Sequence, residues 1–376
     1  MISLLNVVRA PAWAPWRLAV VTGEYGHWFA PAAISLAVLV WFLRDQGAAW
    51  CGAALLLCGV ATALLLKPVY DARRIAAALP AQLAVQFPAG AAPAEPFDIR
   101  LLYSVEAPAT ATVTKQAISP RLPFDLYRPA GIPAARPLPC VVMIHGGGWE
   151  SGDRGQLAHF NHWLAGEGWA VAAISYRLAP AYPWPAQRDD VLAAVAHLKA
   201  HAGELGLDPT RLVLMGRSAG GQLAQVIGYT AVDPAIRGVI ALYAPSDLIF
   251  GYVNTVEDDM LKSPALMRRF LGGTPESARP AYESASALFH VTRRSPPTLL
   301  LHGTNDALVW HRHSQRLDAK LAEAGVPRVL LELPWATHGF EYNLHGPGGQ
   351  LTTYAVAWFL AAVRDGNYKF GDHGHR

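Results

Sequence analysis

The chain is poor in charged residues and in cysteine. Of its 376 residues only 16% are Asp, Glu, Lys or Arg, whereas 52% are hydrophobic, and the formal net charge is +3. Because no basic cluster with interleaved aromatic side chains accompanies this small charge, we expect no nucleic-acid partner. The three cysteines show neither metal-ligand nor redox spacing, so we expect buried thiols and no disulfide framework. They are Cys51, Cys58 and Cys140. So low a charged fraction indicates that part of the chain lies in lipid.

Two runs without charge near the N-terminus predict a pair of transmembrane helices. They cover about 28–43 and 48–66, and Arg44-Asp45-Gln46-Gly47 separates them. At 1.5 Å per residue the runs would span ~24 Å and ~28 Å, close to the ~30 Å hydrocarbon core of a bilayer. A buried helical hairpin in a soluble protein is the alternative. The Ala- and Pro-rich residues 76–95 are expected to connect this anchor, residues 1–75, to the rest of the chain.

Cations outside the two runs predict the orientation of the hairpin. The short loop between the runs carries one Arg beside an Asp, whereas several cations lie at the opposite ends of the runs. These are Arg9, Arg17, Lys67, Arg73 and Arg74. The positive-inside rule therefore places both termini in the cytoplasm. We expect a two-helix membrane protein whose C-terminal domain, residues 96–376, is cytoplasmic.

Downstream of the connector, apolar runs alternate with helical patterns. Two short β-like stretches are followed by six apolar runs that we expect to be buried strands. The eight segments are 111–115, 124–127, 140–144, 170–176, 212–215, 238–243, 298–301 and 329–333. Continuous apolar strands separated by helices are typical of a mostly parallel sheet that helices cover on both faces. We therefore predict an α/β fold, with the weakly periodic segment 250–287 as a lid or pocket-forming insertion.

Two glycine-rich motifs follow apolar runs and point to acyl-transfer chemistry. His145-Gly146-Gly147-Gly148-Trp149 follows the run at 140–144, and Gly216-Arg217-Ser218-Ala219-Gly220-Gly221 follows the run at 212–215. The second motif has the pattern G-x-S-x-G, in which a strand turns sharply into a helix and leaves the serine hydroxyl exposed. The first has backbone N–H groups that, free of Cβ bulk, can point at a developing oxyanion. Together, and in this order, they predict a nucleophile at Ser218.

A serine nucleophile needs a histidine to accept its proton and a carboxylate to orient that histidine. Where a G-x-S-x-G turn supplies the serine, the carboxylate and the histidine follow it in that order. Asp306 lies in a loop directly after the run at 298–301, and His338 lies in a loop after the run at 329–333. The carboxyl ends of parallel strands share one edge of the sheet, so we expect both side chains to converge on Ser218.

Other residues compete for these two roles. Asp247 also follows a strand, but its position favours a cap or a loop brace, and Asp318 falls within a helical pattern. His302 closely precedes Asp306 and is expected to be structural. His145 opens the glycine loop and is expected to brace that loop instead of acting as a base.

Further motifs complete a resemblance to a known family. Tyr176-Arg177-Leu178-Ala179-Pro180 and Trp184-Pro185-Ala186-Gln187 lie between the two glycine-rich motifs, and the strings HGTND and THGF contain Asp306 and His338. As a set, over about 124–363, these motifs resemble the hormone-sensitive-lipase-like and carboxylesterase branch of the α/β-hydrolases. The sequence departs from that family at Arg217, where many relatives carry an acidic residue, and in its two hydrophobic runs, since most relatives are soluble.

The resemblance implies an α/β-hydrolase fold and two sets of site residues. The implied catalytic triad is Ser218, Asp306 and His338. The implied oxyanion hole consists of the backbone N–H groups of Gly147, Gly148 and Ala219.

The leading hypothesis is a membrane-anchored carboxylesterase or lipase-like serine hydrolase that acts on a small-molecule or lipid ester. An amidase, a formamidase or a serine peptidase would use the same triad, and a non-catalytic binding protein with a hydrolase fold is less favoured. No cofactor is expected, because the histidines at 311 and 313 and at 373 and 375 lack the carboxylates of a metal site. Trp149, Trp184 and Trp335 lie near the expected pocket loops, which would suit an apolar acyl or aryl group.

Overall fold

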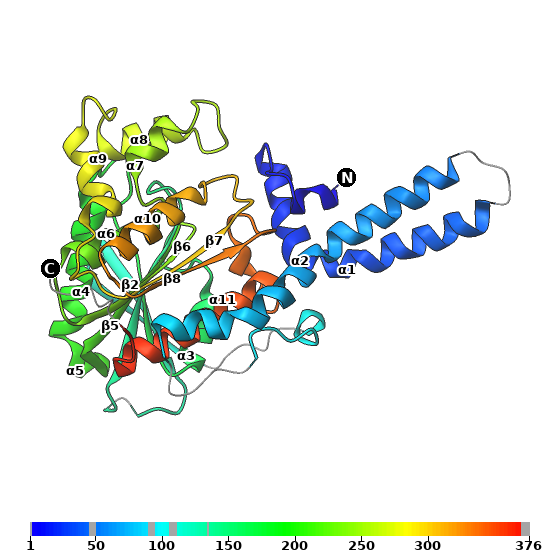
Figure 1. Cartoon of the computed structure of the whole chain (residues 1–376). Coiled ribbons are helices and arrows are strands. Elements are labelled where there is room, and N and C mark those ends of the chain that lie inside the picture. The colour runs from blue at the N-terminus through cyan, green and yellow to red at the C-terminus, as the bar shows by residue number, and fades with distance from the viewer. Residues whose placement is uncertain (1, 45–49, 89–94, 105–110, 134, 370–376) are drawn as a thin grey trace.

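The centre of the C-terminal domain is a twisted sheet of eight strands (Figure 1). The computed structural model describes residues 2–44, 50–88, 95–104, 111–133 and 135–369. The strands are β1 (Ala111–Ser119), β2 (Leu122–Pro129), β3 (Leu138–Ile144), β4 (Ala170–Ile174), β5 (Leu207–Arg217), β6 (Ile236–Leu242), β7 (Thr298–Gly303) and β8 (Arg328–Leu333). Their order in the sheet is β1-β2-β4-β3-β5-β6-β7-β8. β1 and β2 are antiparallel to their neighbours, and β4, β3, β5, β6, β7 and β8 are parallel.

Helices cover both faces of this sheet, which confirms the predicted α/β fold. One face packs against α4 (Ala186–Ala200), α6 (Ala219–Thr230) and α10 (Arg312–Glu323). The other packs against α3 (Ala158–Gly166) and α11 (Pro347–Asp365). β3, β4, β6 and β7 are buried almost throughout, and β5 is buried from Leu212 to Arg217, because both faces of these strands are covered, as their apolar runs predict.

The segment after β6 forms a small helical layer at the carboxyl edge of the sheet, near the region predicted as an insertion at 250–287. It contains α7 (Leu248–Val253), α8 (Ser263–Leu271) and α9 (Arg279–Ala285). The remaining short helices of the chain are η1 (Ile2–Asn6), η3 (Leu101–Tyr103), α5 (Ala202–Leu205), η4 (Ala287–His290) and η5 (Phe340–Tyr342).

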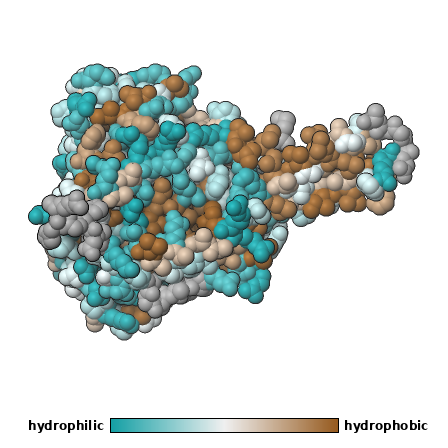
Figure 2. All heavy atoms as spheres, in the orientation of Figure 1, coloured by the Kyte–Doolittle hydropathy of each residue, from teal (hydrophilic) through white to brown (hydrophobic). Residues whose placement is uncertain are grey.

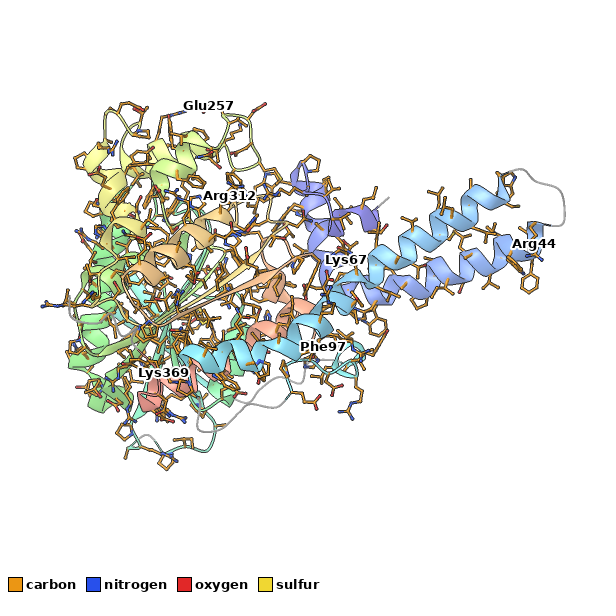
Figure 3. All side chains as sticks on the ribbon, in the orientation of Figure 1. Arg44, Lys67, Phe97, Glu257, Arg312 and Lys369 are labelled. Carbon is orange, nitrogen blue, oxygen red and sulfur yellow. The ribbon has the colours of Figure 1, made fainter. Side chains whose placement is uncertain are left out.

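Two long helices, α1 (Trp13–Leu43) and α2 (Cys51–Gln86), form a hairpin that projects from the domain (Figure 1). Both are long and apolar enough to cross a membrane, and only 22% of the most apolar stretch of each is buried. Apolar side chains cover the projecting part (Figure 2). Arg44 lies near its far end and Lys67 near its base (Figure 3). The predicted loop residues Asp45, Gln46 and Gly47 lie outside the described residues.

Both helices extend beyond the predicted spans. α1 begins at Trp13 instead of residue 28, and α2 continues to Gln86, through most of the segment predicted to be a connector. The reason is burial: Leu79 and Leu83 are completely buried, and just after α2 the carbonyl oxygen of Phe87 accepts a hydrogen bond from Trp358 Nε1 of α11 at 2.7 Å. The helix-favouring Ala and Leu residues of this stretch, packed on the domain, outweigh the proline inside it.

Buried hydrogen bonds connect the first half of α1 to the domain. The carboxylate of Glu24 accepts hydrogen bonds from the backbone N–H of Gly348 at 2.9 Å and from Trp335 Nε1 at 3.4 Å. Upstream of α1, Asn305 Nδ2 donates to the carbonyl oxygen of Leu5 at 2.7 Å. Because unmatched buried polar groups are costly, these contacts fix the start of α1 relative to the sheet edge.

We expect Leu83→Ala to lower the free energy of unfolding by about 2–5 kcal/mol, because it leaves a cavity between α2 and the domain core. Denaturant unfolding of the detergent-solubilised full chain measures the change. The matched control is Val85→Ala on the same helix, where the side chain is 64% exposed and the change should stay near zero. Equal effects of the two substitutions would contradict the inclusion of α2 in the core.

Candidate active site

Ser218 occupies the sharp turn between β5 and α6. Its backbone has φ 51° and ψ −121°, a sparsely populated conformation for a residue with a side chain, and its N–H donates to the carbonyl oxygen of Leu242 at 2.9 Å. The turn packs directly on the end of β3. A Cβ atom at Gly220 would lie 2.2 Å from the carbonyl oxygen of Ile144, so only glycine fits there. The structure therefore has the strand–turn–helix geometry that the G-x-S-x-G pattern predicts.

Asp306 and His338, which the sequence places 32 residues apart, are in direct contact. His338 Nδ1 lies 2.7 Å from Asp306 Oδ2. The other carboxylate oxygen, Oδ1, accepts the backbone N–H groups of Leu308 at 2.8 Å and Val309 at 3.0 Å. These bonds hold the carboxylate in one orientation, with its second oxygen directed at the imidazole.

The charge environment of Asp306 favours its ionised form. Complete burial raises the pKa of this carboxyl group, but His338 and His302 outweigh burial and hold the pKa below its usual value. His302 is itself fixed: its Nδ1 lies 2.7 Å from Ser314 Oγ and its Nε2 lies 3.0 Å from the carbonyl oxygen of Val309. Asp306 therefore presents a carboxylate to His338.

The competing residues have other partners. Asp247 caps α7 by accepting the backbone N–H of Phe250 at 2.9 Å, and its second oxygen pairs with Arg316 at 2.8 Å. Asp318 lies on α10, 3.6 Å from Arg328. Both carboxylates thus have partners other than His338, in keeping with the preference for Asp306.

The glycine loop after β3 is held in a conformation that requires glycine. Gly147 has φ +116°, and a Cβ atom there would lie 2.2 Å from the carbonyl oxygen of Ser151. Gln156 Oε1 accepts the backbone N–H of Gly146 at 2.7 Å, a brace that the sequence did not identify. His145 stacks on Tyr176 with ring centroids 4.1 Å apart, and burial lowers its pKa. His145 is thus a packed, neutral brace.

Three backbone N–H groups, in the glycine loop after β3 and at the β5–α6 turn, are available to donate hydrogen bonds to a ligand. Within the described part of the chain, those of Gly147, Gly148 and Ala219 donate no hydrogen bond. Ala219 is the first residue of α6, where the helix dipole adds positive potential. These are the groups that the sequence resemblance assigns to an oxyanion hole.

A cavity of about 780 Å³ brings these parts together, and we name it the Ser218 cavity. Ser218, His338 and the glycines 146–148 line it, with Leu261, Leu266 and Leu308 as apolar wall residues. Trp13 and Trp16, from the start of α1, also line it. No sequence motif pointed to these two tryptophans, because α1 reaches the cavity only through the tertiary fold.

The tryptophans expected at the pocket rim lie elsewhere. Trp335 is buried in the core beneath α1, and Trp184 packs edge-on against Phe270. Trp149 stacks on the same Phe270 with centroids 4.2 Å apart and lines a smaller cavity beside the Ser218 cavity. These three rings pack in loops and core, which is the more ordinary use of a tryptophan.

A buried ion pair connects the nucleophile turn to the histidine loop. Arg217 Nε lies 2.8 Å from Glu341 Oε1, and both side chains are almost completely buried. The hydroxyl of Tyr243 donates to the same carboxylate oxygen, and the Tyr243 ring lies 4.1 Å from the ring of His338. Burial and the neighbouring carboxylate raise the pKa of Tyr243 well above its usual value, so its hydroxyl stays a donor. Arg217 was visible in the sequence only as a departure from a family pattern.

Among the described residues, no group of three or more His, Cys, Asp or Glu side chains has the arrangement of a metal site. His311 and His313 belong to this described part of the chain, whereas His373 and His375 lie outside it.

Comparisons with known proteins agree with this geometry. The BD-FAE family model matches residues 124–321, which is more than half of the chain and contains Ser218 and Asp306. LipM of Mycobacterium tuberculosis, named a probable carboxylic ester hydrolase, is 31% identical over 255 residues, covering 64% of this chain and 58% of LipM. Esterase LipC of the same organism is 29% identical over 262 residues, covering 66% of this chain and 64% of LipC. The chain thus spans less than two thirds of these relatives.

Solved structures share the fold. The crystal structure of EstE1, a thermostable carboxylesterase cloned from a metagenomic library, superposes with a TM-score of 0.58 at 24% identity. The match covers 71% of this chain and 92% of EstE1. At this identity the likeness concerns the fold, and it confirms the α/β-hydrolase architecture.

We expect Glu341→Gln to lower the free energy of unfolding by about 3 kcal/mol, because the Arg217 guanidinium would stay buried without a counter-charge. The double variant Arg217→Met/Glu341→Gln should recover most of the loss, since it removes both charges. Denaturant unfolding in detergent measures both. The control is Glu323→Gln, whose exposed pair with Lys320 should contribute less than about 1 kcal/mol. If Glu341→Gln were as stable as Glu323→Gln, the proposed contribution of the buried Arg217–Glu341 pair would be contradicted.

Proposed function

The chain belongs to the BD-FAE family, within the carboxylesterase branch of the α/β-hydrolases, and we propose that it cleaves carboxylic esters through an acyl-enzyme on Ser218. The observation that carries the proposal is the hydrogen bond between Asp306 and His338, beside a serine on a strained turn in the same cavity. The names of LipM and LipC, a carboxylic ester hydrolase and an esterase, support the same reaction class.

The mechanism follows from the donors and acceptors at the cavity. Asp306 Oδ2 accepts a hydrogen bond from the Nδ1–H group of His338, which leaves Nε2 free to take the proton of the Ser218 hydroxyl as it attacks the ester carbonyl. The N–H groups of Gly147, Gly148 and Ala219 stabilise the tetrahedral oxyanion. His338 then gives its proton to the leaving alcohol, and an acyl group remains on Ser218. Water, deprotonated by the same histidine, releases the carboxylic acid.

An ester is favoured over an amide or a peptide as the substrate. The triad would serve each of these bonds, so the distinction rests on the family and on the named relatives, which are esterases and ester hydrolases. A purely binding function is disfavoured by the site itself. A strained serine and a completely buried carboxylate are costly to maintain, and catalysis explains both.

We also propose that the projecting hairpin anchors the enzyme in a membrane. Leu56 and Leu57 on α2 are each 69% exposed, and Phe42 on α1 is 74% exposed, which is unfavourable in water. Because the N-terminal segment and the catalytic domain pack together at the base of the hairpin, both must lie on one side of the bilayer. The cations that flank the hairpin favour the cytoplasmic side.

We expect Ser218→Ala to lower kcat/KM for p-nitrophenyl butyrate by at least about 10⁴-fold, because the nucleophile is gone. Asp306→Asn should cost about 10⁴-fold in kcat. The asparagine oxygen can still accept the N–H groups of Leu308 and Val309, while its NH₂ group faces His338 Nδ1 and imposes the wrong tautomer. Steady-state kinetics of the purified full chain measures both.

The control for Asp306→Asn is Asp318→Asn, which removes an acidic group on α10 and should leave kcat/KM within about twofold. Full activity of folded Ser218→Ala would contradict the proposed nucleophile. Full activity of Asp306→Asn, with Ser218→Ala inactive, would contradict the role of the carboxylate alone.

We expect the double variant Leu56→Arg/Leu57→Arg to release the protein from membranes, because each arginine near the centre of a span costs about 3 kcal/mol. The fraction that sediments with membranes after an alkaline carbonate wash measures the effect. The matched control is Val232→Arg on the catalytic domain, a side chain that is equally exposed and should have no influence. Extraction of the wild-type chain by carbonate alone would refute the anchor.

A further inference from the structure

The start of α1 forms one wall of the Ser218 cavity. Trp13 and Trp16 line it, opposite Leu261 and Leu266 from the helical layer that contains α8. The two indoles meet edge to face with centroids 5.5 Å apart. The Nε1 atom of Trp16 is buried and, among the described residues, donates no hydrogen bond. The cavity that holds Ser218 is thus bounded by a helix that continues directly into the proposed anchor.

A second cavity, of about 660 Å³, lies farther along the same helix, and we name it the α1 cavity. Val21, Tyr25, Trp28 and Phe29 of α1 line it, and Tyr342 lines both cavities. Tyr342 therefore borders both spaces, and residues of α1 line both, from Trp13 beside the Ser218 cavity to Phe29.

The polar residues around the α1 cavity are already paired with the protein. The hydroxyl of Ser104 lies 2.8 Å from His345 Nδ1, and His159 Nε2 lies 3.1 Å from the carbonyl oxygen of Tyr342. Asn343 Nδ2 donates to the carbonyl oxygen of Glu24 at 3.3 Å. With these groups satisfied, the aromatic and aliphatic side chains of α1 favour an apolar occupant.

Exposed apolar residues also surround the entrance at the N-terminal end of α1. Ile2, Leu4, Val7 and Val8 precede the helix, and Trp13 itself is 44% exposed. Apolar side chains with tryptophan among them are typical of segments that lie at the interface of a bilayer. This segment therefore favours contact between the start of α1, which lines the Ser218 cavity, and a membrane surface.

We propose that the two cavities bind the acyl chain of a long-chain ester that enters from the bilayer, with Trp13 and Trp16 as its specificity-determining residues. The scissile carbonyl lies at Ser218, the first part of the acyl chain lies against the two indoles, and its end passes Tyr342 into the α1 cavity. The inference rests on the proposed esterase function and names its substrate class.

The test compares two substrates of the full chain in phosphatidylcholine vesicles: p-nitrophenyl palmitate carried in the vesicles and p-nitrophenyl butyrate in solution. The measured quantity is the ratio of kcat/KM for palmitate to that for butyrate. Trp16→Ala and Trp13→Ala should each lower this ratio about tenfold, because a large apolar contact with the long chain is lost. Trp16→Phe, which keeps an aromatic contact, should lower it less.

A second variant tests the α1 cavity. Val21→Trp places a bulky ring into this space from a partly exposed position, so it should shorten the preferred acyl chain, with p-nitrophenyl octanoate retained and palmitate lost. The matched controls are Trp50→Ala near the far end of the hairpin and Val113→Trp on β1, both at exposed positions that touch neither cavity. Both controls should keep the wild-type ratio.

An unchanged ratio in Trp13→Ala and Trp16→Ala overturns the inference. So does an equal loss on both substrates, because it would indicate that the tryptophans only stabilise the fold. These results differ from a failure of the proposed function. In that case the wild-type chain would hydrolyse neither substrate, or Ser218→Ala would be as active as the wild type.

Discussion

Close backbone contact between the β5–α6 turn and the end of β3 is the constraint on which the site depends. At Gly220 the chain passes so near Ile144 and His145 that a Cβ atom would lie 2.2 Å and 2.3 Å from their carbonyl oxygens. This contact sets the nucleophile turn beside the loop that continues from β3. The strained serine and the glycine loop then face one cavity, and the first residue of α6 directly follows the serine.

The charged groups around the β5–α6 turn are a second constraint, because they restrict the position of this turn relative to the loop that contains His338. Arg217, Glu341 and Tyr243 join the residue before the nucleophile to the loop that follows His338, and the Tyr243 ring supports the imidazole. A buried ion pair of this kind adds little net stability, but it penalises any arrangement in which its members separate. An arginine at a position that is acidic in many relatives is therefore compatible with the turn, because Glu341 supplies the opposite charge from the other loop.

The sequence was most informative where a local pattern has one structural solution. The G-x-S-x-G turn, the glycine loop and the placement of Asp306 and His338 after buried strands each follow from a short motif and its preceding strand, and the contact between Asp306 and His338 has the expected geometry. The tryptophans at the cavity could not be predicted in this way. Trp149, Trp184 and Trp335 are near the motifs in sequence, yet the cavity wall comes from Trp13 and Trp16, some 200 residues before Ser218.

The two N-terminal helices are longer than the apolar runs that predicted them, for the same reason. Charge-free hydrophobic runs identify the parts of these helices that are proposed to face lipid. The same criterion predicts that the second helix ends where polar residues return. α2 nevertheless continues to Gln86, because the side chains of Leu79 and Leu83, and of Phe87 just after the helix, are buried against the domain. Whether such a stretch is a connector or a packed helix depends on a partner surface, that of α11, which is formed by residues more than 250 positions away. No local pattern contains that information.

The packing of these helices implies that anchor and catalytic domain form one folding unit. Glu24, buried within α1, accepts hydrogen bonds from the N-terminus of α11 and from Trp335, and the carbonyl oxygen of Leu5 accepts one from Asn305, next to Asp306. Each of these groups would be left without its partner if the anchor were removed, at a cost of about 1–3 kcal/mol for each buried group. The same contacts fix where α1 meets the sheet edge, and so they fix the wall of the Ser218 cavity. In this chain, the interface that positions the proposed membrane anchor also shapes the proposed substrate site.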